Sequence, residues 1–122
     1  MRTYIVADQP QLRSAIQFLL DHQPNIRVVD SIDQKKIILA QIELARPELI
    51  MLDWDMLGQA TVELLMLLCR SKERPSILVL SSRPEVEQVA LQAGADEFIC
   101  KSDSPEKLID ILHKFVKEKT NL

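Results

Sequence analysis

Glycine is scarce in this sequence: Gly58 and Gly94 are the only two among 122 residues. The Gly-rich loops that cradle nucleotide phosphates need several glycines close together, so this class of binding loop is excluded. Cysteine is equally scarce, and Cys69 and Cys100 lie far apart without the spacing of metal ligands. Because two such cysteines form no evident disulfide framework, we expect a reducing, cytoplasmic compartment.

The sequence also lacks a strong excess of charge and a long apolar run. Its formal net charge is -3. The sequence contains no stripe of basic residues of the kind that is typical of nucleic-acid binding. No apolar run approaches the roughly 18 residues that span a membrane. The N-terminal sequence MRTYIVADQP has no apolar signal-peptide core. We therefore expect neither direct nucleic-acid binding nor membrane association.

The chain does contain enough apolar residues for one full core. Hydrophobic residues make up 47% of the sequence, and its length is typical of one domain. No repeat, linker or low-complexity segment divides it. We expect residues 1–122 to form a single domain, with no output domain in this sequence.

Short apolar runs alternate with helical patterns along the whole chain. The clearest run is LIMLD at 49–53, where four apolar residues end in a carboxylate, as is typical of a strand buried on both faces. The other predicted strands are 3–7, 26–29, 77–80 and 98–100. The predicted helices are 10–22, 33–46 with Asp33 as its cap, 60–72, 84–93, and a last one that begins at Pro105.

Strict alternation of strands and helices favours a parallel sheet with helices on both faces. Five strands joined by right-handed crossovers favour the flavodoxin-like, doubly wound order 2-1-3-4-5, here with five helices. Ligands of such folds bind beyond the carboxyl ends of the strands. The expected fold class is therefore α/β, with the functional site at that edge.

Polar residues stand at the ends of four predicted strands: Asp8, Asp53, Ser81 and Lys101. Each alone could be a helix cap, a turn former or a solvated surface residue. Because the carboxyl ends of parallel strands share one edge, we expect all four to converge. Together they fit phosphoryl transfer to a carboxylate. Two acids can hold a hard cation such as magnesium, a lysine can neutralise phosphoryl charge, a hydroxyl can donate a hydrogen bond, and one carboxylate can be the nucleophile.

Four stretches of the chain match a known pattern: IVADQP, LIMLDWDMLG, ILVLSS, and GADEFICK followed by SPEKL. With them, nearly the whole sequence resembles the receiver domain of two-component response regulators, the CheY-like superfamily. The resemblance implies that Asp53 accepts a phosphoryl group from a histidine kinase or phosphotransfer protein. It also implies magnesium as cofactor, bound by Asp8, Asp53 and the backbone carbonyl of Asp55.

The same resemblance suggests roles for the remaining site residues. Ser81, Ser82 and Lys101 would contact the phosphoryl group. Ser81 and Phe98 would form a switch, in which the ring turns inward when the hydroxyl is drawn to the phosphate. Such a domain is not an enzyme in the usual sense, because it catalyses only its own phosphorylation and dephosphorylation. Its output would be protein–protein interaction, through a homodimer or a downstream signalling protein.

Three departures from the family pattern bear on activity. Ala7-Asp8 replaces the usual pair of acids, which implies weaker magnesium affinity. The segment MLG at 56–58 lacks the proline common in the family, and Ser102 stands where a proline commonly follows the lysine. A degenerate receiver that binds its partner without phosphorylation therefore stays open as an alternative.

Asp55 and Arg83 form a further candidate pair, since each lies two residues after a predicted site residue, Asp53 and Ser81. In the family these two positions flank the phosphoryl group. We expect them to form an ion pair that screens this group from water and slows its hydrolysis.

Two other functions share parts of this pattern. A haloacid-dehalogenase-like phosphatase also has a strand that ends in Asp-x-Asp, as Asp53-Trp54-Asp55 does, but two β-α units precede that strand here and no later acidic pair follows Lys101. Flavin binding shares the fold, but the turn at 8–10 lacks the hydroxyl-rich loop that holds a flavin phosphate.

Overall fold

The computed structural model describes residues 1–32 and 38–120 of the chain. Over these residues it contains five strands and six helices. The strands are β1 (Arg2–Val6), β2 (Arg27–Ile32), β3 (Leu49–Asp53), β4 (Ser76–Ser81) and β5 (Glu97–Cys100). The helices are α1 (Pro10–Asp21), α2 (Ile38–Ala45), α3 (Trp54–Leu57), α4 (Ala60–Cys69), α5 (Val86–Ala93) and α6 (Pro105–Thr120).

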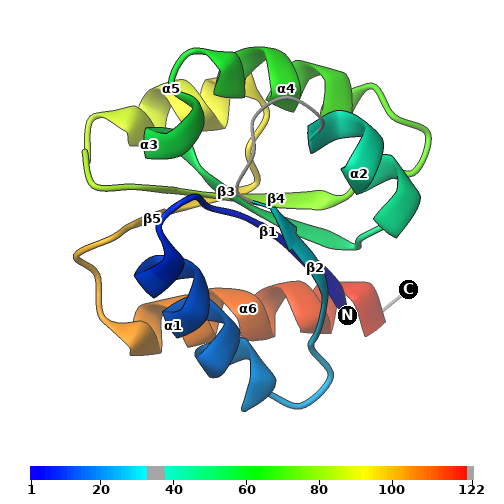
Figure 1. The fold of residues 1–122 in the computed structure, drawn as a ribbon, viewed down its shortest axis with the longest axis vertical. Coiled ribbons are helices and arrows are strands. Elements are labelled where there is room, and N and C mark those ends of the chain that lie inside the picture. The colour runs from blue at the N-terminus through cyan, green and yellow to red at the C-terminus, as the bar shows by residue number, and fades with distance from the viewer. Residues whose placement is uncertain (33–37, 121–122) are drawn as a thin grey trace.

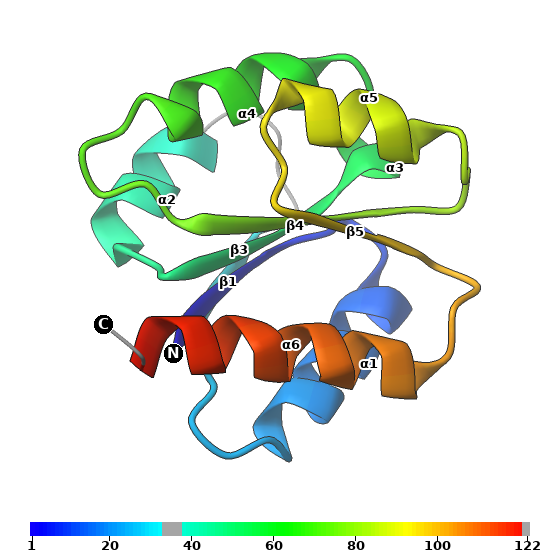
Figure 2. The ribbon, with the colours of Figure 1, turned by 180° about the vertical axis from the view of Figure 1, so that it is seen from behind.

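The five strands form one sheet in the order β2-β1-β3-β4-β5, and every neighbouring pair is parallel. This confirms the predicted doubly wound, flavodoxin-like topology. Helices α1 and α6 cover one face of the sheet, and α2, α4 and α5 cover the other (Figures 1 and 2). In the described part of the chain no helix has the length and apolar character needed to cross a bilayer.

Each face of the sheet has its own apolar core. Successive side chains of a strand point to opposite faces, so β3 serves both cores. It supplies Ile50 and Leu52 to the core under α2, α4 and α5, and Leu49 and Met51 to the core under α1 and α6. All four are fully buried, which explains the unbroken apolar run at the centre of the sequence.

The prediction of five helices was wrong by one, because the short helix α3 follows β3 directly. Asp53 caps it by accepting a hydrogen bond from the backbone N–H of Asp55, with an N···Oδ1 distance of 3.0 Å. Gly58 ends it at a positive φ of 58°. Four residues are too few to show a helical period, so α3 has no recognisable signal in the sequence pattern. The predicted cap Asp33 lies outside the described residues.

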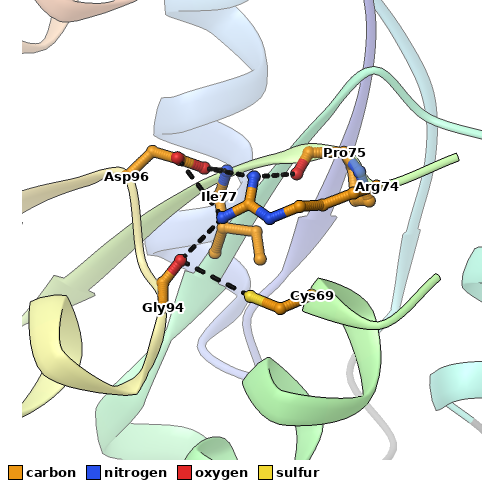
Figure 3. A network of polar contacts seen from close by, with 6 residues as sticks. All are labelled: Cys69, Arg74, Pro75, Ile77, Gly94 and Asp96. Atoms are coloured by element: carbon orange, nitrogen blue, oxygen red, sulfur yellow. Dashed lines mark hydrogen bonds and ion pairs between the residues drawn. The ribbon is translucent and has the colours of Figure 1, made fainter. Parts of the chain in front are cut away.

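A network of hydrogen bonds and an ion pair connects the C-terminal end of α5 to the sheet (Figure 3). The Arg74 guanidinium donates to the carbonyl of Gly94 at 2.9 Å and pairs with the Asp96 carboxylate at 3.1 Å. Asp96 in turn accepts the backbone N–H of Ile77 at 2.8 Å. This network lies where β4 and β5 begin, and it fixes the start of the strand that ends just before Lys101.

Candidate functional site

The register of the sheet brings the predicted site residues to one edge. Asp53 is paired with Leu80 of β4, and Ser81 is paired with Cys100 of β5. The parallel strands therefore end together, with Lys101 as the next residue after β5. Asp8 follows β1 by two residues at the same edge and is exposed.

Asp53 is a nearly inaccessible carboxylate, with 1% of its surface exposed. Its Oδ1 accepts the backbone N–H of Asp55 and pairs with the Lys101 ammonium at 2.9 Å. Its Oδ2 is buried and finds no hydrogen-bond partner among the described residues. A buried polar atom without a hydrogen-bond partner costs free energy, so Oδ2 gains by binding a partner from outside the chain. Oδ2 is therefore the oxygen that is available to attack an electrophile or to bind a cation.

Lys101 stands between two carboxylates. Its Nζ lies 2.9 Å from Asp53 Oδ1 and 3.1 Å from Asp55 Oδ2. Burial lowers the pKa of Lys101, but the hydrogen bonds from the ammonium to Asp53 and Asp55 outweigh it and raise the pKa above its usual range. One positive charge thus faces two negative charges at the bottom of the site.

The side chain of Asp55 gathers three donors. Oδ1 accepts the Ser81 hydroxyl at 2.7 Å, and Oδ2 accepts the backbone N–H of Ser82 at 2.8 Å as well as the Lys101 ammonium. Burial raises the pKa of Asp55, but the bonds from Ser81, Ser82 and Lys101 outweigh it and hold the pKa far below its usual range. The sequence analysis missed this side-chain role, since spacing along a chain does not reveal where a side chain points.

The expected ion pair between Asp55 and Arg83 is not formed in the described structure, where Asp55 pairs with Lys101 instead. The donors of Ser81 and Ser82 are fixed at the end of β4 and contact Asp55 directly. They need less ordering than a long guanidinium side chain does, so they hold the carboxylate. Arg83 donates its backbone N–H to the Ser81 hydroxyl at 3.1 Å, and the residue lines the hollow described next.

A shallow hollow opens over the site, lined by Gln9, Asp55, Ser82, Arg83 and Lys101. Another hollow lies at the opposite edge of the sheet, between α2, α4 and the segments that lead into β3 and β4. Its lining contains none of the predicted site residues. The chemistry of the molecule is therefore expected at the first hollow.

The donors for a cation are few. Among the residues that the structure describes, no three or more His, Cys, Asp or Glu side chains group closely enough to hold a metal ion. The carboxylates of Asp53 and Asp8 and the backbone carbonyl of Asp55 are hard oxygen donors of the kind that magnesium prefers. The unpartnered Oδ2 of Asp53 fits such an ion. The donor chemistry agrees with magnesium, and joint binding by Asp8 and Asp53 stays a prediction.

Phe98 lies in β5 with its ring buried in the core under α4 and α5. The same core contains Val86 and Ala90 of α5. The ring therefore occupies an inward position in this structure.

Comparison with known proteins agrees with the fold and identifies the family. The family model of the response regulator receiver domain matches residues 3–113. The nitrate/nitrite response regulator NarL of Escherichia coli K12 is 32% identical over 112 residues, which cover 90% of this chain and 52% of NarL. The phosphate regulon transcriptional regulatory protein PhoB of Klebsiella pneumoniae is 29% identical over 88% of this chain and 48% of PhoB.

Solved structures show the same fold. The response regulatory domain of mrkE from Klebsiella pneumoniae superposes with a TM-score of 0.90 at 20% sequence identity, and it covers 100% of both chains. The chain spans about half the length of the curated relatives it matches. On the family match and the geometry together, this chain belongs to the response regulator receiver domain family of two-component systems.

Proposed function

We propose that the domain accepts a phosphoryl group on Asp53 from the phosphohistidine of a kinase or phosphotransfer protein. One observation carries the proposal: a buried carboxylate has Oδ1 held by Lys101 at 2.9 Å, while Oδ2 has no partner among the described residues. Such an oxygen is a nucleophile whose neighbour supplies the compensating charge.

The transfer conserves atoms and charge. Asp53 Oδ2 attacks the phosphorus, an O–P bond forms, and the P–N bond to the imidazole breaks. The electron pair of that bond stays on the imidazole nitrogen, which takes up a proton. The product is an acyl phosphate on Asp53, beside the Lys101 ammonium that neutralises part of its charge.

Asp8, Asp53 and the backbone carbonyl of Asp55 would hold magnesium, which supplies further neutralisation of phosphoryl charge when bound. The phosphoryl oxygens would be bound by the Ser81 hydroxyl, the Ser82 N–H and the Lys101 ammonium. We name these three groups the donor cradle. All three already converge on one carboxylate, that of Asp55, at distances of 2.7, 2.8 and 3.1 Å.

The output is proposed to be protein–protein interaction at the surface of α5, β5 and α6. Ser81 ends β4, and Phe98 lies on the neighbouring β5, so a shift of the hydroxyl can reach this surface through two paired strands. Helix α5 also carries Val89 and Leu91 with 47% and 43% of their surfaces exposed. A second copy of the domain or a downstream signalling protein would bind there.

Treatment with acetyl phosphate and magnesium, followed by intact mass measurement, tests the proposed function. We expect the wild-type protein to gain one phosphoryl group, and the Asp53→Ala and Asp53→Asn variants to gain none. Circular dichroism of each variant controls for folding. A folded wild-type protein that gains no phosphoryl group would contradict the proposal.

Such a negative result would favour the second candidate, a receiver that binds its partner without phosphorylation. Two observations support this candidate. Ala7 replaces one of the usual acids, and Asp55 already fills the donor cradle.

A further inference from the structure

The donor cradle holds an anion that the chain supplies itself. Ser81 Oγ, Ser82 N and Lys101 Nζ bind the Asp55 carboxylate at 2.7, 2.8 and 3.1 Å. Under the proposed function, these are the donors needed by the phosphoryl oxygens. A carboxylate is a planar oxyanion, and it satisfies the same donors that a phosphoryl group would use.

We propose that Asp55 is a resident anion, which occupies the donor cradle of the unphosphorylated domain and must leave it when Asp53 is phosphorylated. The inference rests on the proposed function and extends it. It assigns to the Asp55 side chain a gating role that neither the sequence pattern nor the family match assigns.

Charge is the first reason that the two anions exclude each other. The Lys101 ammonium already faces the Asp53 and Asp55 carboxylates at 2.9 and 3.1 Å. A phosphoryl group on Asp53 adds further negative charge at the same place, and like charges at contact distance repel strongly in a partly buried site. The Ser81 hydroxyl and the Ser82 backbone N–H each have a single hydrogen to donate, and both donate it to Asp55. Asp55 must therefore release them before the phosphoryl oxygens can bind.

Access is the second reason. Asp53 Oδ2 is buried, and Asp53 is not among the described residues that line the hollow over the site. Lys101 and Asp55 do line it, and Asp53 Oδ1 is bound by the Lys101 ammonium and by the Asp55 backbone N–H. The Lys101 ammonium also binds the Asp55 carboxylate, so the two acids share it. Release of the Asp55 side chain would free the donors and let the Lys101 ammonium move toward an incoming phosphodonor.

The Asp55 carboxylate is held in place rather than loosely resting on the surface. Ser81 is fully buried, and its hydroxyl is itself fixed by the backbone N–H of Arg83 at 3.1 Å. Ser82 contributes a backbone donor, whose position is set by the end of β4. Release of Asp55 breaks these bonds together, so the resident anion slows phosphorylation.

The first test measures the rate of phosphorylation by acetyl phosphate with magnesium. We expect Asp55→Ala to be phosphorylated about tenfold faster than wild type, which corresponds to about 1.4 kcal/mol in the barrier. Asp55→Asn keeps the size and one acceptor oxygen but loses the charge, and it should lie between the two. Asp110→Ala is the matched control, because it removes one exposed carboxylate from α6, away from the cradle. Its rate should equal that of wild type.

The second test needs neither phosphodonor nor magnesium. Inorganic phosphate is titrated into each protein while the amide resonance of Ser82 is followed by NMR. With the resident anion gone, the cradle of Asp55→Ala should bind phosphate and shift this resonance with a saturable curve. Wild type and Asp110→Ala should show no saturable shift over the same range.

The outcomes separate the inference from the proposed function. Equal phosphorylation rates in wild type and both Asp55 variants, with no phosphate binding at Ser82, would overturn the resident anion while the function stands. Saturable phosphate binding by Asp55→Ala, with no phosphorylation of any variant, would support the resident anion and refute the phosphoacceptor function. If Asp55→Ala fails to fold, Asp55→Asn carries both tests.

Discussion

Lys101 carries the positive charge that compensates the carboxylates of Asp53 and Asp55. Its side chain is 16% exposed, and the Asp53 side chain that it contacts is 1% exposed. Removal of the ammonium leaves two carboxylates near each other, one of them buried. Loss of one partner of a buried ion pair is strongly destabilising, because the remaining charge has no compensation.

We therefore predict that Lys101→Ala lowers the free energy of unfolding at pH 7 by about 2 kcal/mol, less than for a fully buried pair because Asp55 is partly solvated. Urea denaturation measures the change. Lys107→Ala is the control: its ammonium pairs with Asp103 at 3.0 Å on the surface, with 55% of the lysine side chain exposed. Exposed pairs contribute little to stability. Equal losses in the two variants would show that Lys101 is not the counter-ion of a buried charge.

For single residues, the sequence predicted which of them meet at the site, but it did not predict the hydrogen bonds and ion pairs that each side chain forms. Asp53, Ser81 and Lys101 could be placed because each stands at the end of a predicted strand. The side chain of Asp55 could not, because its direction depends on α3, a helix too short to have a period. The spacing of Asp55 and Arg83 favours an ion pair between them. This pair does not form in the structure, because Ser81 and Ser82 offer closer donors that the end of β4 already holds in position.

Among the elements, the junction between α5 and β5 is tightly constrained at Gly94. Gly94 caps α5 with a φ of 120°, and a Cβ built on it would lie 2.5 Å from the Cys69 sulfur. The same residue offers its carbonyl to Arg74 and to the Cys69 thiol (Figure 3). Both the backbone conformation and the available space therefore require glycine here.

We predict that Gly94→Ala lowers the free energy of unfolding by about 2–4 kcal/mol, through backbone strain and overpacking together. Introducing Cys69→Ala into this variant removes the clash with sulfur. The double variant should recover the overpacking part and keep the backbone part, so the effects of the two substitutions should not add. Additive losses in thermal or urea unfolding would mean that the contact between Gly94 and Cys69 is not the cause.

The predicted elements agree with the observed ones where the apolar pattern is long. β3 at 49–53 has the predicted bounds, because burial on both faces makes its first four residues apolar and the carboxylate of Asp53 marks its end. β2 runs three residues past its predicted end, to Ile32, through Asp30 and Ser31. Polar residues in an edge strand carry no apolar signal, and here strand pairing with β1 decides the structure.

For the whole molecule, alternation of strands and helices was sufficient to predict the sheet order. Right-handed crossovers leave few arrangements for five parallel strands, and the observed one follows. The fold alone could not choose between a receiver, a phosphatase and a flavin protein. The family match over residues 3–113 and the Lys101–Asp53 pair together identify the receiver.

Chemical mapping of the acyl phosphate identifies the residue that accepts the phosphoryl group. Borohydride reduces an aspartyl phosphate to homoserine, which peptide mass mapping can place at one position. After treatment with acetyl phosphate and magnesium, we predict homoserine at position 53 and at neither Asp8 nor Asp55. Homoserine at either of those positions, or none at all in a folded protein, would contradict this prediction.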